Sequence, residues 1–324
     1  MNLDDKIYIA GHNGLVGSAI YRMLQQTGFI NIITANSFDL DLRNQFAVRN
    51  FFQKEKPQYV FLAAAKVGGI MANKTYGAEF IYDNLTVQNN VIHEAYKCGV
   101  DKLLFLGSSC IYPKLANQPI KEEYFMTGAL EPTNAPYAMA KIAGVEMCKA
   151  YQQQYGCRFI SVMPTNLYGP GDNYDLENAH VLPALIRKFH EAKANNEPSV
   201  TIWGTGKPRR EFLHVDDAAS ACIFLMQQYE DPSIINIGCG EDYSIKEMAD
   251  AIKIITEFEG NLFFDITKPD GTMQKLLEVS KLTNLGWKCS INLLEGLSAT
   301  YKDFGERYEY YISKKRINSF PDNV

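Results

Sequence analysis

Tyrosine and lysine are spaced four residues apart in the segment Tyr137-Ala-Met-Ala-Lys141. At the start of a helix, this spacing places both side chains on one face. A tyrosine with an ordinary pKa of about 10 transfers protons slowly at neutral pH, and a neighbouring ammonium favours its phenolate. Ser108 follows an apolar run at 103–107 and supplies a hydroxyl that can hold a carbonyl oxygen beside the tyrosine. The three residues together indicate proton transfer at a carbonyl group, although Tyr-x-x-x-Lys alone is a common surface spacing.

A second motif lies near the start of the chain, where Gly11-His-Asn-Gly14-Leu-Val-Gly17 separates an apolar run from an amphipathic stretch. The run at 6–10 predicts a buried strand, and the stretch from Gly14 onward predicts a helix. Glycines at this spacing allow a tight turn and a close approach of the backbone to a pyrophosphate, which the helix N-terminus then binds. This placement predicts a dinucleotide site that includes Gly11, Asn13, Gly14, Leu15, Val16 and Gly17.

The stretch after the second expected strand bears on which dinucleotide is bound. An acidic residue there binds the ribose hydroxyls of NAD, whereas a basic residue binds the 2′-phosphate of NADP. Thr34-Ala-Asn-Ser37 contains neither, and Asp39 and Asp41 follow slightly later. We expect Ser37 and Asp41 to contribute to the site, with Asp41 accepting a hydrogen bond from the adenine, although a solvated loop acid explains Asp41 nearly as well. The residues by themselves leave NADPH and NADH both open.

Alternating apolar runs and helical stretches must position these motifs. Runs at 30–33, 59–65, 102–107 and 159–163 are separated by helical patterns that include 80–98 and 137–155. This alternation is typical of βαβ units and predicts an α/β fold, a Rossmann-type doubly wound parallel sheet. Shorter runs and Pro/Gly-rich loops after residue 170 predict a smaller C-terminal α/β substrate lobe. We therefore expect an NAD(P)-binding Rossmann domain over 1–170, with segments at about 212–240 returning to it, and a ligand lobe over 171–324.

Composition excludes several other classes of protein. The chain has 324 residues, of which 46% are hydrophobic and 21% charged, as in ordinary globular proteins. A net charge of −5 gives no support for nucleic-acid or anionic-membrane binding. Seven scattered cysteines without a Cys-x-x-Cys pair favour reduced thiols over disulfides or a metal site, and thus a cytoplasmic protein. No stretch approaches the roughly 18 apolar residues of a membrane helix, and the N-terminus lacks a signal-peptide pattern.

Longer strings carry a family resemblance. With the glycine turn, Ser108, Tyr137 and Lys141 form the constellation of the extended short-chain dehydrogenase/reductase family, which residues 6–169 resemble. Within it the chain resembles the GDP-L-fucose synthase family to about residue 302, in Ala63-Ala-Ala-Lys-Val-Gly-Gly-Ile70, Leu106-Gly-Ser-Ser-Cys-Ile-Tyr-Pro113, Glu131-Pro-Thr-Asn134, Met163-Pro-Thr-Asn-Leu-Tyr-Gly-Pro170 and Trp203-Gly-Thr-Gly. The resemblance implies an NADPH-dependent oxidoreductase and epimerase that inverts C3 and C5 of GDP-4-keto-6-deoxy-D-mannose and reduces C4 to give GDP-L-fucose. It also implies a homodimer paired through helices of the Rossmann lobe.

The resemblance assigns roles to individual residues. Ser108, Tyr137 and Lys141 match the reductive triad, while Cys110 matches the base and His180 the acid of epimerisation. A carbonyl at C4 acidifies both neighbouring C–H bonds, so a thiol and an imidazole are suitable groups to remove a proton and return another. The remaining matches are to positions around the dinucleotide, namely Leu106, Gly107, Pro164, Asn166, Leu167 and His180. Positions that hold the GDP-sugar in the family are matched by Lys188, Trp203, Arg210 and Asp270.

Some positions depart from the family pattern. Bacterial members commonly carry arginine in the glycine turn and after the second strand, where this chain has Asn13, Ala35 and Ser37, so that NADH use is also open. Gln274 and Glu278 replace an arginine and an aspartate that often follow Pro-Asp-Gly-Thr.

Three alternatives remain beside the leading interpretation. A GDP-L-colitose synthase-type enzyme would act on a 3-deoxy sugar in the same site and invert C5 alone. A sugar-nucleotide 4,6-dehydratase would carry an Asp-Glu pair where Ser109-Cys110 stands. A non-catalytic module that senses the cofactor would not need the tyrosine and lysine, which are both present.

Overall fold

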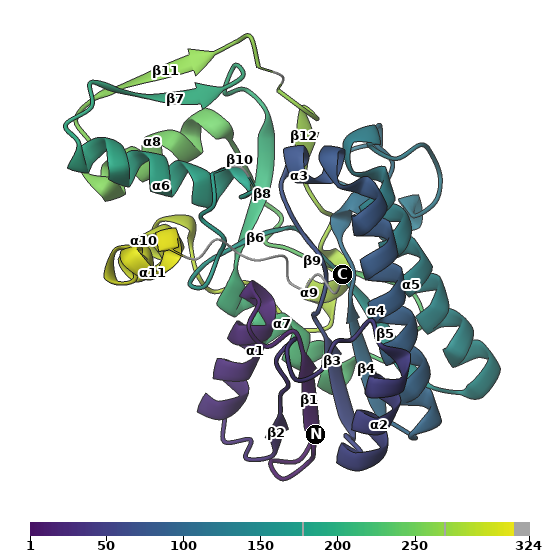
Figure 1. Ribbon diagram of the computed structural model, residues 1–324. Coiled ribbons are helices and arrows are strands. Elements are labelled where there is room, and N and C mark those ends of the chain that lie inside the picture. Colours follow the sequence, from purple (N-terminus) through teal and green to yellow (C-terminus); the bar gives the residue numbers. More distant parts are fainter. Residues whose placement is uncertain (177, 269, 314–324) are drawn as a thin grey trace.

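A parallel sheet of six strands forms the centre of the larger lobe (Figure 1). The computed structural model describes residues 1–176, 178–268 and 270–313. In spatial order the strands are β2 (Ile32–Ile33), β1 (Ile7–Ala10), β3 (Tyr59–Leu62), β4 (Lys102–Leu106), β5 (Arg158–Pro164) and β9 (Ile235–Ile237). Because the strand order reverses at β1, the carboxyl ends of β1 and β3 form the switch point at which such sheets bind ligands. The glycine turn follows β1 and lies at this point.

Helices cover both faces of the sheet, and each face has its own hydrophobic core. On one face lie α1 (Leu15–Gln26) and α7 (Val215–Gln228), which bury Ile20 and Leu225. On the other face lie α2 (Gln45–Glu55), α4 (Gly77–Lys97) and α5 (Ala135–Tyr155), with the short α3 (Ile70–Thr75) preceding α4. The strands are apolar almost throughout because both of their faces are covered. The predicted doubly wound α/β fold is confirmed.

A smaller lobe stands beside the carboxyl ends of these strands (Figure 1). Its strands are β7 (Ser199–Trp203), which pairs with β11 (Asn261–Asp265), and β8 (Arg209–His214), which pairs with β6 (Asn166–Tyr168), β10 (Asp242–Ser244) and β12 (Gln274–Lys275). Around them pack α6 (Val181–Ala194), α8 (Ile245–Thr256), α10 (Leu293–Glu306) and α11 (Tyr308–Ser313). Phe189, Ile202 and Phe304 are buried at the centre of this lobe.

The chain passes between the lobes more than once. After β8 it returns to the larger lobe, where α7 packs beside α1 and β9 becomes the sixth strand of the sheet. A short helix, α9 (Ser280–Asn284), also buries Leu282 in this core. Residues 314–324 of the expected ligand lobe lie outside the described residues. Among the described helices, none combines the length and the apolar character needed to cross a membrane.

Candidate active site

The glycine turn forms a tight cradle between β1 and α1. Gly11 adopts φ +89°, a left-handed conformation that favours glycine, and a Cβ on Gly17 would lie 2.1 Å from the Gly11 carbonyl oxygen. Gly14 caps α1 without a side-chain hydrogen bond, so the N–H groups of the first turn, which begins with Leu15 and Val16, are not capped by a side chain. These features fit a pyrophosphate bound at the helix N-terminus. The turn therefore has the backbone geometry of a dinucleotide site, and the assignment of its residues to such a site stays a prediction.

Ser108, Tyr137 and Lys141 come together at the carboxyl end of β4. Ser108 lies two residues beyond Leu106, the last residue of the strand, and hydrogen-bonds the Tyr137 hydroxyl. Tyr137 and Lys141 lie in the first two turns of α5, and the Lys141 Nζ is 5.9 Å from the centre of the Tyr137 ring. The same ammonium donates to the Leu106 carbonyl oxygen at 2.8 Å. The helix and the strand thus hold all three side chains in one group, as the sequence spacing predicts.

Burial decides the protonation of this group. It raises the pKa of Tyr137, the nearby Cys110 raises it further, and the hydrogen bond from Ser108 offsets only part of the rise. Burial also lowers the pKa of Lys141 to about 7. The spacing predicts that the lysine ammonium favours the phenolate, whereas in the structure burial is the largest influence on Tyr137 and moves its pKa in the opposite direction. The phenol stays protonated at neutral pH and is suited to donate a proton.

Cys110 lies two residues beyond Ser108, in a short 3-10 turn at Ser109–Ile111. Its backbone N–H donates to the Ser108 Oγ at 3.2 Å, which fixes the serine hydroxyl beside the thiol. The sulfur itself receives a hydrogen bond from the Asn134 Nδ2 at 3.2 Å, and the Lys275 Nζ lies 3.8 Å away. An ammonium at this distance attracts negative charge on the sulfur.

His180 stands at the N-terminus of α6 and faces the same lysine. The imidazole is accessible to solvent. Surrounding protein lowers its pKa by desolvation, and the positive charge of Lys275 lowers it further. Lys275 therefore lies between the thiol and the imidazole and acts on both. Two predicted residues from distant parts of the chain thus share one charged neighbour.

Sequence reasoning missed both Lys275 and Asn134. Lys275 belongs to β12, a strand of only two residues that pairs with β8 opposite Arg210. Asn134 lay in Glu131-Pro-Thr-Asn134, a string that carried the resemblance, and Lys275 followed Pro-Asp-Gly-Thr, next to the departure at Gln274. The polar side chains in and beside these strings were the signal that could have identified both residues.

The candidate sugar-binding residues form two groups. Arg210 is partly buried, which lowers its pKa, and it lies next to Lys275 in the register of β8 and β12. Lys188 and Trp203 lie farther out in the smaller lobe, where the lysine Nζ is 5.7 Å from the tryptophan ring and 3.3 Å from the Thr201 carbonyl oxygen. Burial lowers the pKa of Lys188. An exposed tryptophan flanked by cations can stack on a flat base or ring.

The carboxylate of Asp270 is already hydrogen-bonded within the protein. Its two carboxylate oxygens accept hydrogen bonds from the Thr205 N–H at 2.6 Å and the Thr205 hydroxyl at 2.9 Å. It therefore ties two loops of the smaller lobe together. Asp41 is similarly engaged, because it accepts hydrogen bonds from the backbone N–H and the guanidinium of Arg43 at 2.9 to 3.3 Å. Any ligand must share these carboxylates with their present partners.

The remaining candidates around the dinucleotide lie at strand ends. Gly107 directly follows β4, at a point where a Cβ would clash with the Met163 side chain, and Pro164 ends β5. Asn166 donates to the Glu211 carbonyl oxygen at 2.8 Å and, with Leu167, belongs to β6. Ser37 follows β2 on the side of the sheet that carries the glycine turn.

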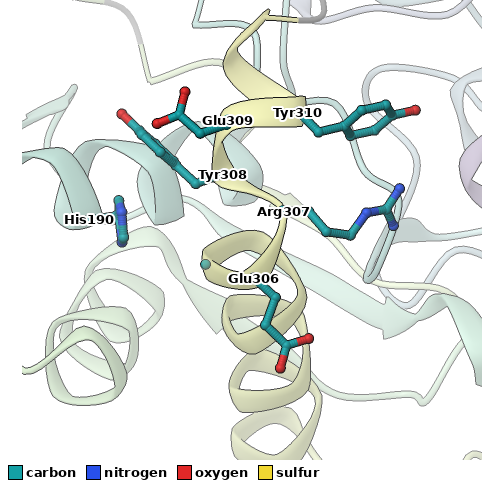
Figure 2. Close-up of a pocket in the computed structure, with 7 residues that line it drawn as sticks. His190, Glu306, Arg307, Tyr308, Glu309 and Tyr310 are labelled. Carbon is teal, nitrogen blue, oxygen red and sulfur yellow. The ribbon is translucent and has the colours of Figure 1, made fainter.

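A hollow of about 550 Å³ lies apart from these residues, at the junction of α10 and α11 (Figure 2). His190, Arg307, Tyr308 and Tyr310 line it, and none of the predicted site residues does. The candidate catalytic residues therefore gather at the strand ends, away from this hollow.

Comparison with known proteins identifies the family of the chain. The model of the NAD dependent epimerase/dehydratase family matches residues 7–238. The chain belongs to this family. It is 58% identical over 296 residues to GDP-L-fucose synthase 1 of Arabidopsis thaliana, which covers 91% of this chain and 92% of the relative.

Two solved structures of similar proteins bear on the ligands. A GDP-L-fucose synthetase from Naegleria fowleri bound to NADP superposes with a TM-score of 0.89 at 31% identity, covering 95% of this chain and 96% of that one. A GDP-6-OMe-4-keto-L-xylo-heptose reductase from C. jejuni has a TM-score of 0.91 at 43% identity, with 95% and 99% covered. The similarity in each case extends over both lobes.

Proposed function

We propose that the chain is a GDP-L-fucose synthase, which epimerises GDP-4-keto-6-deoxy-D-mannose at C3 and C5 and then reduces C4. One observation carries the proposal: the group Ser108–Tyr137–Lys141 is joined directly to Cys110, and Lys275 links Cys110 to His180. A ketone reductase needs the first group alone, whereas epimerisation needs a second acid–base pair. The high identity to GDP-L-fucose synthase 1 supports the same activity.

Epimerisation uses the thiol and the imidazole. The Cys110 thiolate removes a proton from the carbon beside the C4 carbonyl, and the Ser108 and Tyr137 hydroxyls stabilise the negative charge that develops on the carbonyl oxygen. His180 returns a proton from the opposite face, and its lowered pKa makes the imidazolium a stronger acid. Before the second carbon reacts, the Cys110 thiol must release the proton that it took and His180 must regain one; because His180 is exposed to solvent, water can exchange these protons.

Reduction uses the phenol. NADPH, bound against the glycine turn, supplies the hydride for C4. Tyr137 gives its proton to the alkoxide oxygen, and burial of the tyrosine keeps that proton in place beforehand. Lys141 holds the Leu106 carbonyl and lies against the tyrosine ring, so that it fixes the position of the phenol.

The test is to incubate the protein with GDP-4-keto-6-deoxy-D-mannose and NADPH and to determine the stereochemistry of the product by NMR. GDP-L-fucose is expected. In D₂O without dinucleotide, Cys110→Ser should suppress deuterium incorporation at C3 and C5 while dinucleotide binding persists. Turnover of the 3-deoxy ketone but not of this substrate would favour a GDP-L-colitose synthase. A product reduced at C4 without inversion would place the chain with simple ketone reductases.

We further propose a cytoplasmic homodimer paired through α4 and α5. Large apolar side chains are exposed on these helices, among them Tyr82 at 66% and Met139 at 51%. All seven cysteines are free, as expected of a reducing compartment. Light scattering of the purified protein should give twice the mass of 36.6 kDa.

A further inference from the structure

Three polar side chains connect the glycine turn to the loop after β2. The Asn13 Nδ2 donates to the Asn36 Oδ1 at 2.9 Å, and the Asn36 Nδ2 donates to the Asp39 Oδ2 at 3.2 Å. In Rossmann folds the adenosine ribose lies between these two segments. We propose that this end of the site reads a free ribose hydroxyl and does not select a 2′-phosphate, so that NADH binds at least as tightly as NADPH. The proposal rests on the dinucleotide site of the proposed function.

The first argument is the distribution of positive charge. Residues 7–42, which form β1, the glycine turn, α1 and the loop after β2, contain a single lysine or arginine, Arg22. Arg22 lies on α1 and forms an ion pair at 2.9 Å with Asp216 of α7, on the covered face of the sheet. It is therefore directed toward another helix. A 2′-phosphate carries nearly two negative charges at neutral pH and normally requires a guanidinium or ammonium partner.

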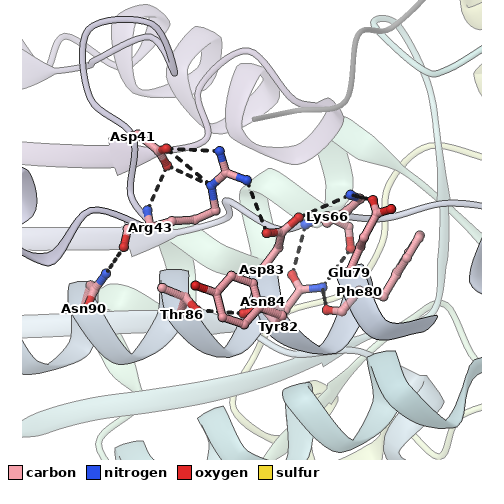
Figure 3. Close-up of polar contacts among 10 residues, drawn as sticks. All are labelled: Asp41, Arg43, Lys66, Glu79, Phe80, Tyr82, Asp83, Asn84, Thr86 and Asn90. Carbon is pink, nitrogen blue, oxygen red and sulfur yellow. Dashed lines mark hydrogen bonds and ion pairs between the residues drawn. The ribbon is translucent and has the colours of Figure 1, made fainter. Parts of the chain in front are cut away.

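The next arginine along the chain, Arg43, is held by carboxylates. Its guanidinium bonds to Asp41 at 3.0 Å and to Asp83 of α4 at 3.3 Å, and Asn90 donates to its backbone carbonyl at 3.0 Å (Figure 3). Asp83 in turn pairs with the buried Lys66 at 3.2 Å. Moving Arg43 toward a phosphate would leave Asp83, which is only 5% exposed, without part of its compensation.

The second argument is the chemistry of the three side chains themselves. Asp39 is exposed and carries a negative charge, which repels a 2′-phosphate but accepts a hydrogen bond from a hydroxyl. Asn36 donates to Asp39 and accepts from Asn13, so its amide is fixed at both ends. The side-chain Oδ1 of Asn13, whose Nδ2 donates to Asn36, is then a further hydrogen-bond acceptor beside the turn. Acceptors suit a ribose hydroxyl, which can donate, and do not suit a phosphate dianion, which cannot.

The test is to measure dissociation constants for NADH and NADPH by titration calorimetry on the protein without sugar, at several salt concentrations. The Kd of NADH should equal or fall below that of NADPH, and the ratio of NADPH to NADH Kd should not increase with salt. A Kd for NADPH more than twofold lower, with the advantage lost in high salt, would show a cation at the 2′-phosphate and overturn the inference. Failure of both dinucleotides to bind would instead contradict the proposed function, and the inference with it.

Two variants test the named residues. Asp39→Asn should lower the Kd of NADPH about threefold and change that of NADH less than twofold, because a nearby like charge is removed. Its control is Asp101→Asn, an exposed acid just before β4 at the opposite end of the strands, which should change neither. Asn13→Arg should lower the Kd of NADPH about tenfold by supplying a charged donor. An unchanged NADPH affinity in both Asp39→Asn and Asn13→Arg would refute the placement of the ribose.

Discussion

Replacing Lys275 by methionine isolates the effect of its charge on Cys110 and His180. The variant keeps a chain of similar length on β12 but removes the ammonium that lies 3.8 Å from the Cys110 sulfur. Opposite unit charges about 4 Å apart attract by about 1 kcal/mol in water and by about 4 kcal/mol at an effective dielectric constant of about 20. Both side chains are partly exposed, so a value of about 2 kcal/mol is appropriate for the attraction that the variant removes, which corresponds to a factor of roughly 30 in rate.

The assay is deuterium incorporation at C3 and C5 of GDP-4-keto-6-deoxy-D-mannose in D₂O without dinucleotide, followed by NMR. Lys275→Met should slow the exchange about 30-fold at neutral pH. The pKa of His180 should also rise, since one of the two causes of its lowering is removed, so any loss of rate from imidazolium deprotonation should move to higher pH. Lys207→Met, at an exposed loop lysine of the same lobe, is the control. Exchange in Lys275→Met within threefold of the wild-type rate, or an equal loss in the control, would refute the reasoning.

Three further predictions follow from the same contacts. Tyr137→Phe should reduce C4 reduction by about 10²–10⁴-fold, because the alkoxide loses its proton donor, whereas deuterium exchange at C3 and C5 should slow much less, because Ser108 still stabilises the negative charge on the carbonyl oxygen. Lys141→Met should raise the free energy of unfolding near pH 7 by about 3 kcal/mol in urea titrations, since the folded protein holds this lysine at a pKa of about 7 and the unfolded chain near 10.5. Between these values the unfolded chain binds more protons, so the wild type gains stability as pH rises and the difference should disappear toward pH 10; a constant difference would contradict this. Glu211→Gln should destabilise the protein by about 2 kcal/mol, because the buried carboxylate accepts from the Leu277 and Gly240 N–H groups at 3.0 and 2.8 Å, and unchanged urea midpoints would exclude that role.

Local sequence patterns were sufficient for the parts of the site that one turn or one helix builds. The four-residue spacing of Tyr137 and Lys141 places both side chains on one face of α5, and the glycine spacing determines the shape of the turn before α1. Long apolar runs likewise predicted the central strands, because strands covered on both faces need apolar side chains throughout. These features depend on neighbours in the sequence, so no distant contact was needed to find them.

Features built by distant pairing were missed. Lys275 meets Cys110 across 165 residues of sequence, through a strand too short to show any periodicity. The strands β6 and β10 were not predicted for the same reason, since each has only three residues. Helix α2 buries only Val48 and Phe52, so its apolar pattern is weak. The protonation of Tyr137 also depended on burial by other elements, which the spacing of two residues cannot express.

The position of β9 has a consequence for synthesis of the protein on the ribosome. Its residues 235–237 form the outer strand beside β5, so the first 170 residues expose an unpaired strand edge and the apolar surface that α7 later covers. An emerging chain cannot complete this sheet until about 70 more residues have been added, which takes several seconds at elongation rates of about 5–20 residues per second. Premature termination within that interval would leave an aggregation-prone fragment rather than a smaller, functional nucleotide-binding domain.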